Sequence, residues 1–288
     1  MKSRRFRFWS IFFISIFSLW MLTGYVFAKK MTDPTNTDYP DILRIDSFKV
    51  QRKNIVSSDG TRINAWLAGN NKNRTVILLP GIHANSSHMV ERAKIYLANG
   101  FSVLLPDLRG EGKSESQKIS FGWNERHDLL ACVRWLKNNG YENIGVHGCS
   151  LGAATITYSF DSLTDYRFVV LESPYYNIDR ALAHRTFDTG CNRFFFWPVY
   201  FFTRMETGIN ADELSPLHCI SKYKGPLLYF AGDREKNIPI DECNGIFDSS
   251  NSTNKHLHFF HNADHFDFLH FQPTEYKSFL TDFLHTLN

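Results

Sequence analysis

One pentapeptide near the middle of the chain could carry nucleophilic chemistry. Gly148-Cys149-Ser150-Leu151-Gly152 fits the pattern G-x-S-x-G and lies between an apolar run, 144–147, and a helical pattern that begins near Ser150. In that setting the serine occupies a sharp turn between strand and helix, where small flanking residues let the two elements approach each other. The turn would hold the hydroxyl out above the sheet. The simpler alternative is a serine that only caps a helix.

A serine hydroxyl is a weak nucleophile at neutral pH, so chemistry at Ser150 needs a base that takes its proton. The chain offers twelve histidines. His256 and His258 alternate within an apolar segment, 256–260, and are expected to be structural or surface residues of a strand. His261 lies at the end of that segment and His265 lies in the next loop.

The elements that must position these groups alternate along the chain. After a hairpin signal at Asp59-Gly60, short apolar runs are separated by helical patterns, which predicts a mostly parallel, doubly wound sheet with helices on both faces. The expected strands are 48–57, 61–67, 76–79, 102–105, 144–147, 168–171, 227–231 and 256–260; the expected helices are 88–99, 125–139, 153–160, 240–248 and 273–287.

From about Val50 to its C-terminus the chain resembles the α/β-hydrolase family, and within it small membrane-tethered or exported esterase-like members. Four segments match in order, namely the oxyanion loop (78–82), the D-x-R-G-x-G-x-S loop (107–114), the nucleophile elbow (148–152) and the acid and histidine loops (232–239 and His265). The resemblance implies an α/β-hydrolase fold, a serine triad, and neither a metal nor an organic cofactor.

The same resemblance assigns the other triad members. Family members place the base in the loop after the last strand, which favours His265 over His261. Their acid pattern, G-x-x-D-x-x-V-P, is counted back from proline, and in this chain it puts Glu235 in the acid position. Asp233, in the same loop, is the alternative.

An oxyanion hole needs two N–H donors near the developing negative charge. The resemblance gives this role to the backbone of Leu151, directly after the nucleophile, and of Ile82, directly after Pro80-Gly81. Relatives commonly have His-Gly at the latter position, but a backbone donor does not depend on the side chain. His83 is either a pocket residue or a surface histidine. Four charged residues are expected to be structural: Asp107, Arg109, Glu125 and Asp128.

The N-terminus is expected to lie outside the fold, as a signal anchor or signal peptide over 1–30. Residues 1–7 are basic, 8–28 carry no charge, and Lys29 and Lys30 follow. An apolar helix of this length spans about one bilayer. We favour an uncleaved anchor; the alternative is cleavage after Ala28. Either way the basic flank stays cytoplasmic and the domain lies on the non-cytoplasmic side, membrane-anchored or secreted/periplasmic. We expect a linker, 31–45, and a hydrolase domain, 46–288.

A lid insert is expected over about 174–222, and it is short and rich in aromatic residues. It contains Phe187 and an apolar run, 194–202, which is costly to expose to water. The run either packs on the core as a cap helix, or forms an acyl pocket or a surface that touches the bilayer.

Composition excludes several classes. Residues 1–30 hold six of the 32 basic residues and no acid, so the rest carries 26 basic against 29 acidic residues, which argues against a nucleic-acid partner. The five cysteines form no CxxC pair, which favours free thiols over a metal site and leaves one disulfide as an alternative.

The leading hypothesis is a serine esterase or thioesterase that acts on a small-molecule or acyl substrate through an acyl-enzyme. An acyltransferase or peptidase would use the same triad. The alternative from another class is a non-catalytic binding protein on a hydrolase scaffold.

Overall fold

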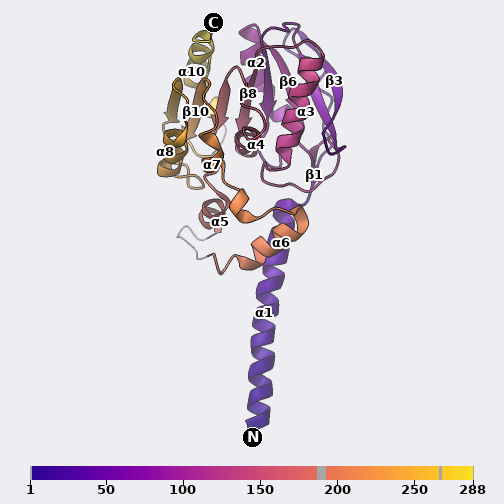
Figure 1. Ribbon diagram of the computed structural model, residues 1–288, viewed down its shortest axis with the longest axis vertical. Coiled ribbons are helices and arrows are strands. Elements are labelled where there is room, and N and C mark those ends of the chain that lie inside the picture. The colour runs from indigo at the N-terminus through magenta and orange to yellow at the C-terminus, as the bar shows by residue number, and fades with distance from the viewer. Residues whose placement is uncertain (1, 187–192, 266–267, 288) are drawn as a thin grey trace.

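A nine-stranded sheet lies at the centre of this computed structural model, within the residues it describes, 2–186, 193–265 and 268–287 (Figure 1). The strand order is β11-β10-β9-β8-β5-β6-β4-β3-β2. All neighbours from β11 to β6 are parallel, and β4, β3 and β2 complete the sheet antiparallel. The expected mostly parallel α/β sheet is confirmed.

The strands of this sheet are β2 (Arg44–Ile45), β3 (Phe48–Val56), β4 (Arg62–Ala68), β5 (Thr75–Leu79), β6 (Ser102–Pro106), β8 (Ile144–Cys149), β9 (Val169–Glu172), β10 (Leu227–Gly232) and β11 (Lys255–Phe260). A separate parallel pair consists of β1 (Thr35–Asn36) and β7 (Glu111–Gly112). The helices are α1 (Lys2–Thr32), α2 (Val90–Ala98), α3 (Glu125–Asn138), α4 (Leu151–Ser159), α5 (Ile178–Thr186), α6 (Trp197–Thr207), α7 (Pro216–Ile220), α8 (Ile240–Ser249), α9 (Phe268–Phe271) and α10 (Pro273–His285), with two 3-10 turns, η1 (Ser86–Met89) and η2 (Ala211–Glu213).

Both faces of the parallel strands β5, β6, β8, β9 and β10 are buried, which explains why these strands are mostly apolar rather than alternating. Strands β3 and β11, nearer the two edges, keep exposed or half-exposed positions. In β5, Ile77 and Leu79 join the hydrophobic cluster that also holds residues of α3, α4 and α8. Val76 and Leu78 point to the opposite cluster, which holds residues of α2 and α10. Every expected strand and helix is present with ends shifted by a few residues, except that the helix expected over 88–99 begins as the turn η1.

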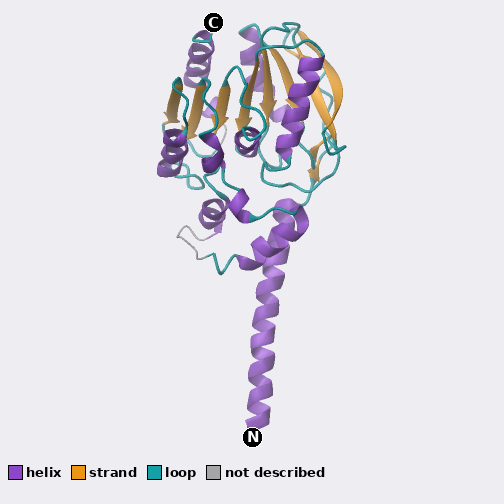
Figure 2. Ribbon diagram, viewed as in Figure 1, coloured by secondary structure: helices purple, strands orange, loops and turns teal. Residues whose placement is uncertain are grey.

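The insert between β9 and β10 contains α5, α6, η2 and α7. It lies at the end of the sheet toward which the parallel strands run, on the same side as α1 (Figure 2). The aromatic run, 194–202, is partly helical, because α6 begins at Trp197. Phe187 lies outside the described residues.

Residues 31–45, expected as a linker, are fastened to the domain. Helix α1 continues through Thr32, and Thr35 then pairs with Glu111 in the β1–β7 ladder. The side-chain amide of Asn36 donates to the carbonyl oxygen of Ser114 at 2.7 Å, and the hydroxyl of Tyr39 donates to Asp107 at 2.8 Å. Polar composition suggested a free spacer, but here the polar groups bind loops of the domain.

Candidate active site

Ser150 occupies a strained turn between β8 and α4. Its backbone has φ 48° and ψ −107°, and its N–H donates to the carbonyl oxygen of Glu172 at 2.8 Å. The two glycines of the elbow are required by close packing, since a Cβ on Gly148 would lie 2.4 Å from the carbonyl carbon of Gly152. A Cβ on Gly152 would lie 2.4 Å from the carbonyl oxygen of Leu79. A strained backbone conformation that close packing holds in place is typical of a functional residue.

A chain of hydrogen bonds runs from Ser150 through His265 to Glu235. The Ser150 Oγ lies 3.0 Å from His265 Nε2, and His265 Nδ1 hydrogen-bonds to Glu235 Oε1. Glu235 is buried, and its second oxygen accepts a hydrogen bond from Ser173 Oγ at 2.8 Å. A buried carboxylate in this place can hold an imidazole with Nε2 toward the hydroxyl.

The two alternative residues form a separate pair. Asp233 accepts from the backbone N–H of Asn262 at 2.6 Å, and its carboxylate lies 2.7 Å from Nδ1 of His261, whose side chain is 78% exposed. The structure thus brings Ser150, His265 and Glu235 together and leaves Asp233 and His261 outside that chain of hydrogen bonds.

The loop after β5 lies beside the nucleophile. A Cβ on Gly81 would lie 3.6 Å from Ser150 Cβ, so the expected donor Ile82 is carried on a segment that borders the hydroxyl. The next residue, His83, has φ 58°, and its backbone N–H donates to Glu111 Oε1 at 2.5 Å. Burial raises the pKa of Glu111 to about 9. Sequence reasoning missed Glu111, although an acid amid the glycines of its loop was a usable signal.

The loop 107–114 acts as a brace, as expected. Asp107 accepts hydrogen bonds from the backbone N–H of Ser86 at 2.8 Å and of Lys113 at 2.9 Å, which ties its own loop to η1. Arg109 pairs with buried Asp128 at 2.6 Å. Glu125 accepts from the backbone N–H of Gly122 at 2.9 Å. Each of these charged side chains is therefore bound by other residues of the domain.

A buried polar cluster lies behind the elbow, and sequence reasoning missed it. Arg92 donates to both oxygens of Glu172, at 2.8 and 2.6 Å, and His147 Nε2 lies 2.7 Å from the same carboxylate. Burial opposes ionisation of Glu172, but Arg92 and His147 hold its pKa below the ordinary value. His147, Cys149 and Glu172 lie close enough to hold a metal ion. Because Arg92 already engages both carboxylate oxygens, we assign the cluster to supporting the elbow.

Among the described residues, four cysteines are present and none of them forms a disulfide. Cys132, Cys219 and Cys243 are free thiols, and burial raises the pKa of Cys132 above its ordinary value. Cys149 Sγ lies 3.9 Å from Met89 Sδ. Cys191 lies outside the described residues.

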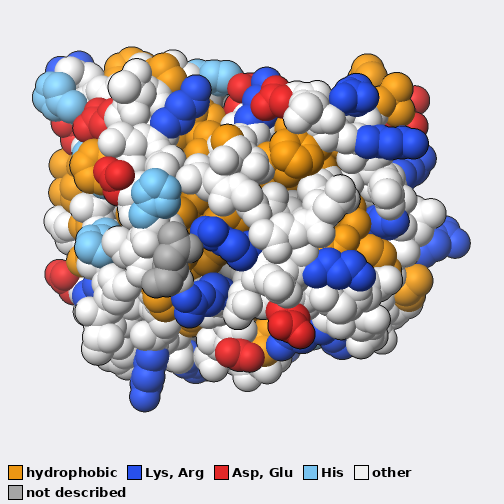
Figure 3. All heavy atoms as spheres, turned by 90° about the horizontal axis from the view of Figure 1, so that it is seen from above, with side chains coloured by type: hydrophobic (Ala, Val, Ile, Leu, Met, Phe, Trp, Pro, Cys, Tyr) orange, Lys and Arg blue, Asp and Glu red, His pale blue; other side chains and the backbone are white. Residues whose placement is uncertain are grey.

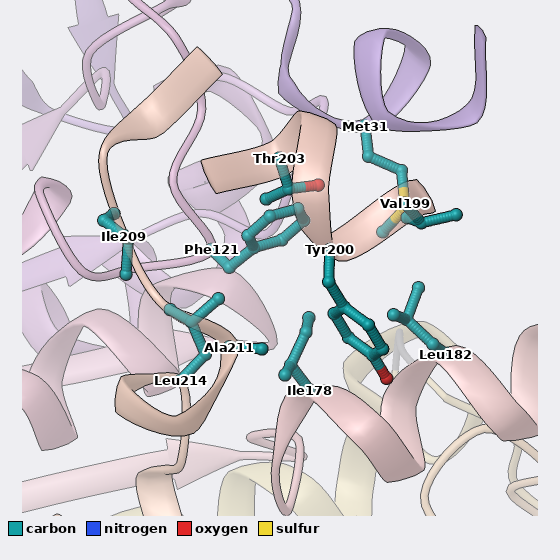
Figure 4. A pocket seen from close by; sticks show the side chains of 10 residues that line it. All are labelled: Met31, Phe121, Ile178, Leu182, Val199, Tyr200, Thr203, Ile209, Ala211 and Leu214. Atoms are coloured by element: carbon teal, nitrogen blue, oxygen red, sulfur yellow. The ribbon is translucent and has the colours of Figure 1, made fainter. Parts of the chain in front are cut away.

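An apolar pocket lies between the insert and the core (Figure 4). Helices α5 and α6 contribute half of its lining residues, and the end of α1 contributes Met31. Phe121 closes it on the core side, next to Gly122, where a Cβ would lie 2.9 Å from the backbone nitrogen of Thr155 in α4. The full lining is Met31, Phe121, Ile178, Leu182, Val199, Tyr200, Thr203, Ile209, Ala211 and Leu214.

Comparison with known proteins shows the family of this chain. The model of the prolyl oligopeptidase family matches residues 87–287, which include the elbow, the acid loop and the histidine loop. The chain belongs to the prolyl oligopeptidase family. It is a serine hydrolase with the α/β-hydrolase fold, as expected from its sequence.

Three individual proteins are similar to this chain over different shares of its length. The uncharacterized protein YqkD of Bacillus subtilis is 28% identical over 284 residues, which cover 91% of this chain and 90% of that protein. The esterase Pf2001 of Pyrococcus furiosus is 25% identical, with a TM-score of 0.74, and the match covers 89% of this chain and 100% of the esterase. An acyl transferase of Aliivibrio fischeri is 30% identical over 113 residues, 38% of this chain and 36% of that protein.

Proposed function

We propose that the protein hydrolyses carboxylic esters or thioesters through an acyl-enzyme on Ser150. The observation that carries the proposal is the hydrogen-bonded series from Ser150 Oγ through His265 to the buried carboxylate of Glu235. His265 Nε2 takes the proton as Ser150 attacks the acyl carbon, and returns it to the leaving group. Glu235 orients the imidazole and stabilises its charged form. Water then attacks the acyl-enzyme, with His265 again taking the proton, and the carboxylic acid leaves Ser150.

The backbone N–H groups of Ile82 and Leu151 are proposed to bind the oxyanion. Leu151 begins α4, so its N–H belongs to the positive end of a helix. Ile82 lies between Gly81, which borders Ser150, and His83, which is fixed by Glu111. Donors fixed before the substrate arrives stabilise the transition state without reorganisation.

The insert is proposed to act as a lid. Its apolar pocket has about 10 Å³ of free space, room for about one water molecule, so it would receive an acyl chain only when the lid moves away from the core. Phe121 lines the pocket and is followed by Gly122, which packs closely on Thr155 of α4, the helix that begins directly after Ser150. The pocket lining is dominated by aliphatic and aromatic side chains, which suits a hydrocarbon chain better than a peptide.

Residues 8–28 are proposed to anchor the enzyme in a membrane. Helix α1 is long and apolar enough to cross a bilayer, and over most of its length it is exposed. Arg4, Arg5 and Arg7 precede the apolar run, which favours a cytoplasmic N-terminus and a domain on the other side.

Fluorophosphonate labelling of the purified chain, followed by an acyl chain-length series of esters and thioesters, tests the proposal. We expect one labelled serine, Ser150, and loss of labelling in Ser150→Ala but not in Ser162→Ala, a control at an exposed serine. Labelling that survives Ser150→Ala would refute the assignment. A labelled enzyme that cleaves only peptides would replace the ester proposal with a peptidase.

Acyl transfer is the second candidate, because part of the chain is similar to the acyl transferase of Aliivibrio fischeri. The chemistry differs only in the second step, where an acceptor hydroxyl replaces water. Adding alcohols of increasing size to an ester assay separates the two, since a transferase forms a new ester in preference to the free acid. A non-catalytic scaffold would give neither product nor labelling.

A further inference from the structure

The lid and the N-terminal helix are joined by aromatic packing. Trp20 of α1 stacks on Phe194 and Trp197, with ring centroids 5.5 and 6.1 Å apart, and its indole N–H donates to the carbonyl oxygen of Phe195 at 3.0 Å. One turn further along α1, Gly24 provides the close approach, because a Cβ there would lie 2.3 Å from Pro198 Cβ. Helix α6 therefore lies directly against the proposed membrane segment.

Much of this lid surface is apolar and exposed. We call its five most exposed large apolar residues the aromatic platform; they are Phe194 (65% exposed), Phe195 (60%), Trp197 (47%), Phe201 (40%) and Met205 (68%). The platform is continuous with the exposed apolar side chains of α1, which Trp20 joins to it. An exposed apolar patch of this kind marks a contact surface, and the neighbouring apolar helix indicates that the partner is lipid.

The position of Trp20 along α1 sets the depth of the platform. Trp20 lies eight residues before Ala28, the last residue of the apolar run, which is about 12 Å along the helix. A hydrocarbon layer is about 30 Å thick, so Trp20 falls within its outer half when 8–28 spans it. If the lid stayed wholly above the layer, only 8–19 would be left to span, about 18 Å.

Charged groups mark where the insertion must stop. Lys118 pairs with Glu206 at the end of α6 and, at 2.6 Å, with Asp33 just beyond α1. These groups lie at the end of the apolar run, where lipid headgroups begin. On the other side, Arg193 pairs with Asp212 at 2.8 Å and keeps the start of the platform bound to the polar part of the lid. The exposed Arg204, between Phe201 and Met205 in α6, must then extend its guanidinium group toward the headgroups while the platform side chains reach into hydrocarbon.

We propose that the aromatic platform inserts into the outer leaflet beside α1, as a second membrane contact that turns the lid toward lipid. The inference rests on the proposed anchoring through 8–28. The carboxyl ends of the parallel strands, where Ser150 lies, point toward the same side (Figure 2), whereas charged side chains of both signs are scattered over the opposite end of the molecule (Figure 3). The acyl substrates would accordingly be membrane-resident, and would reach the lid pocket from the bilayer.

The test measures depth and needs no activity. The full chain, as Phe195→Cys or Met205→Cys, carries an environment-sensitive fluorophore on the introduced thiol and is placed in phosphatidylcholine vesicles with brominated acyl chains. The unsubstituted chain, treated in the same way, corrects for labelling of native thiols. Leu43→Cys is the matched control. Leu43 is apolar and 71% exposed, but it directly precedes β2, an edge strand of the central sheet, and does not belong to the lid. We expect both lid probes to lose most of their fluorescence and the control to lose none. Unquenched lid probes on vesicle-bound protein would overturn the proposal.

Activity measurements on two substrates distinguish a failure of this inference from a failure of the proposed function. Phe195→Lys and Met205→Lys should keep wild-type hydrolysis of a short water-soluble ester and lose hydrolysis of a long-chain ester embedded in vesicles. An equal fall on both substrates would refute a membrane-specific role of the platform. Quenching as expected in a chain that cleaves neither ester would refute only the proposed esterase activity.

Discussion

Ser173 donates a 2.8 Å hydrogen bond to Glu235 Oε2, while the other oxygen of that carboxylate faces His265. Ser173 directly follows β9 and has φ 43°, so two strand ends, those of β9 and β10, together fix the position of the acid. This arrangement distinguishes Glu235 from Asp233, whose oxygens are used by His261 and Asn262.

Glu235→Gln should lower kcat strongly, by up to about 10⁴-fold, the range found when a triad acid is made neutral. The amide cannot stabilise the charged imidazole. Asp233→Asn is the matched control in the same loop and should change kcat little. Steady-state kinetics on a soluble ester measures both, and the reverse order of effects would transfer the role of acid to Asp233.

His265→Ala should lower kcat by at least about a thousandfold, because it removes the imidazole whose Nε2 lies 3.0 Å from Ser150 Oγ. His261→Ala should retain most activity, since its imidazole is bound to Asp233. The two variants are compared for kcat and for the rate of fluorophosphonate labelling. Greater damage from His261→Ala would show that the base is misassigned.

The sequence predicted the fold well because its central parallel strands are buried on both faces and appear as short apolar runs between amphipathic helices. The resemblance to α/β-hydrolases assigned Glu235 and His265, and the two side chains meet in the structure because they follow adjacent strands, whose carboxyl ends share one edge. Glu111 and Ser173 were missed because they act by binding other residues of the site. The polar composition of residues 31–45 predicts a linker, because a polar segment that binds loops has the same composition as a solvated one.

Arg92→Met should destabilise the protein by about 3–5 kcal/mol, the cost of leaving one partner of a buried ion pair uncompensated. Both oxygens of Glu172 bind Arg92, and both side chains are buried. Denaturant unfolding measures the loss. The double variant Arg92→Met, Glu172→Gln removes the unpaired charge and should recover part of it; a double variant no more stable than Arg92→Met would show that the charge is not the cause.

A fusion of residues 1–45 to alkaline phosphatase should be active in a bacterial host, because the basic residues before the apolar run oppose its translocation. An inactive but expressed fusion would refute export. Mass spectrometry of the mature full chain then separates the two exported forms. Intact α1 in the membrane fraction means an anchor, whereas a mature N-terminus at Lys29 means cleavage after Ala28.

Glu111→Gln should stabilise the protein increasingly as pH rises. The folded-state pKa of Glu111 is about 9, raised by burial and, to a lesser degree, by Glu125 and Asp107, whereas the unfolded chain ionises near the ordinary value of 4.5. Between these values the folded state keeps a proton that the unfolded state has released, so stability falls with rising pH by up to about 1.4 kcal/mol per unit.

Glutamine carries no such proton and keeps an oxygen for the N–H of His83. The gain from Glu111→Gln should thus be small near pH 5 and largest near pH 8, with activity on a soluble ester retained. Glu142→Gln, at an exposed glutamate, is the control and should show no pH-dependent gain. Unfolding free energies measured at both pH values decide the matter: an equal gain at pH 5 and 8 would mean that Glu111 is already ionised in the folded protein, and that the loop bearing Ile82 is held by a carboxylate.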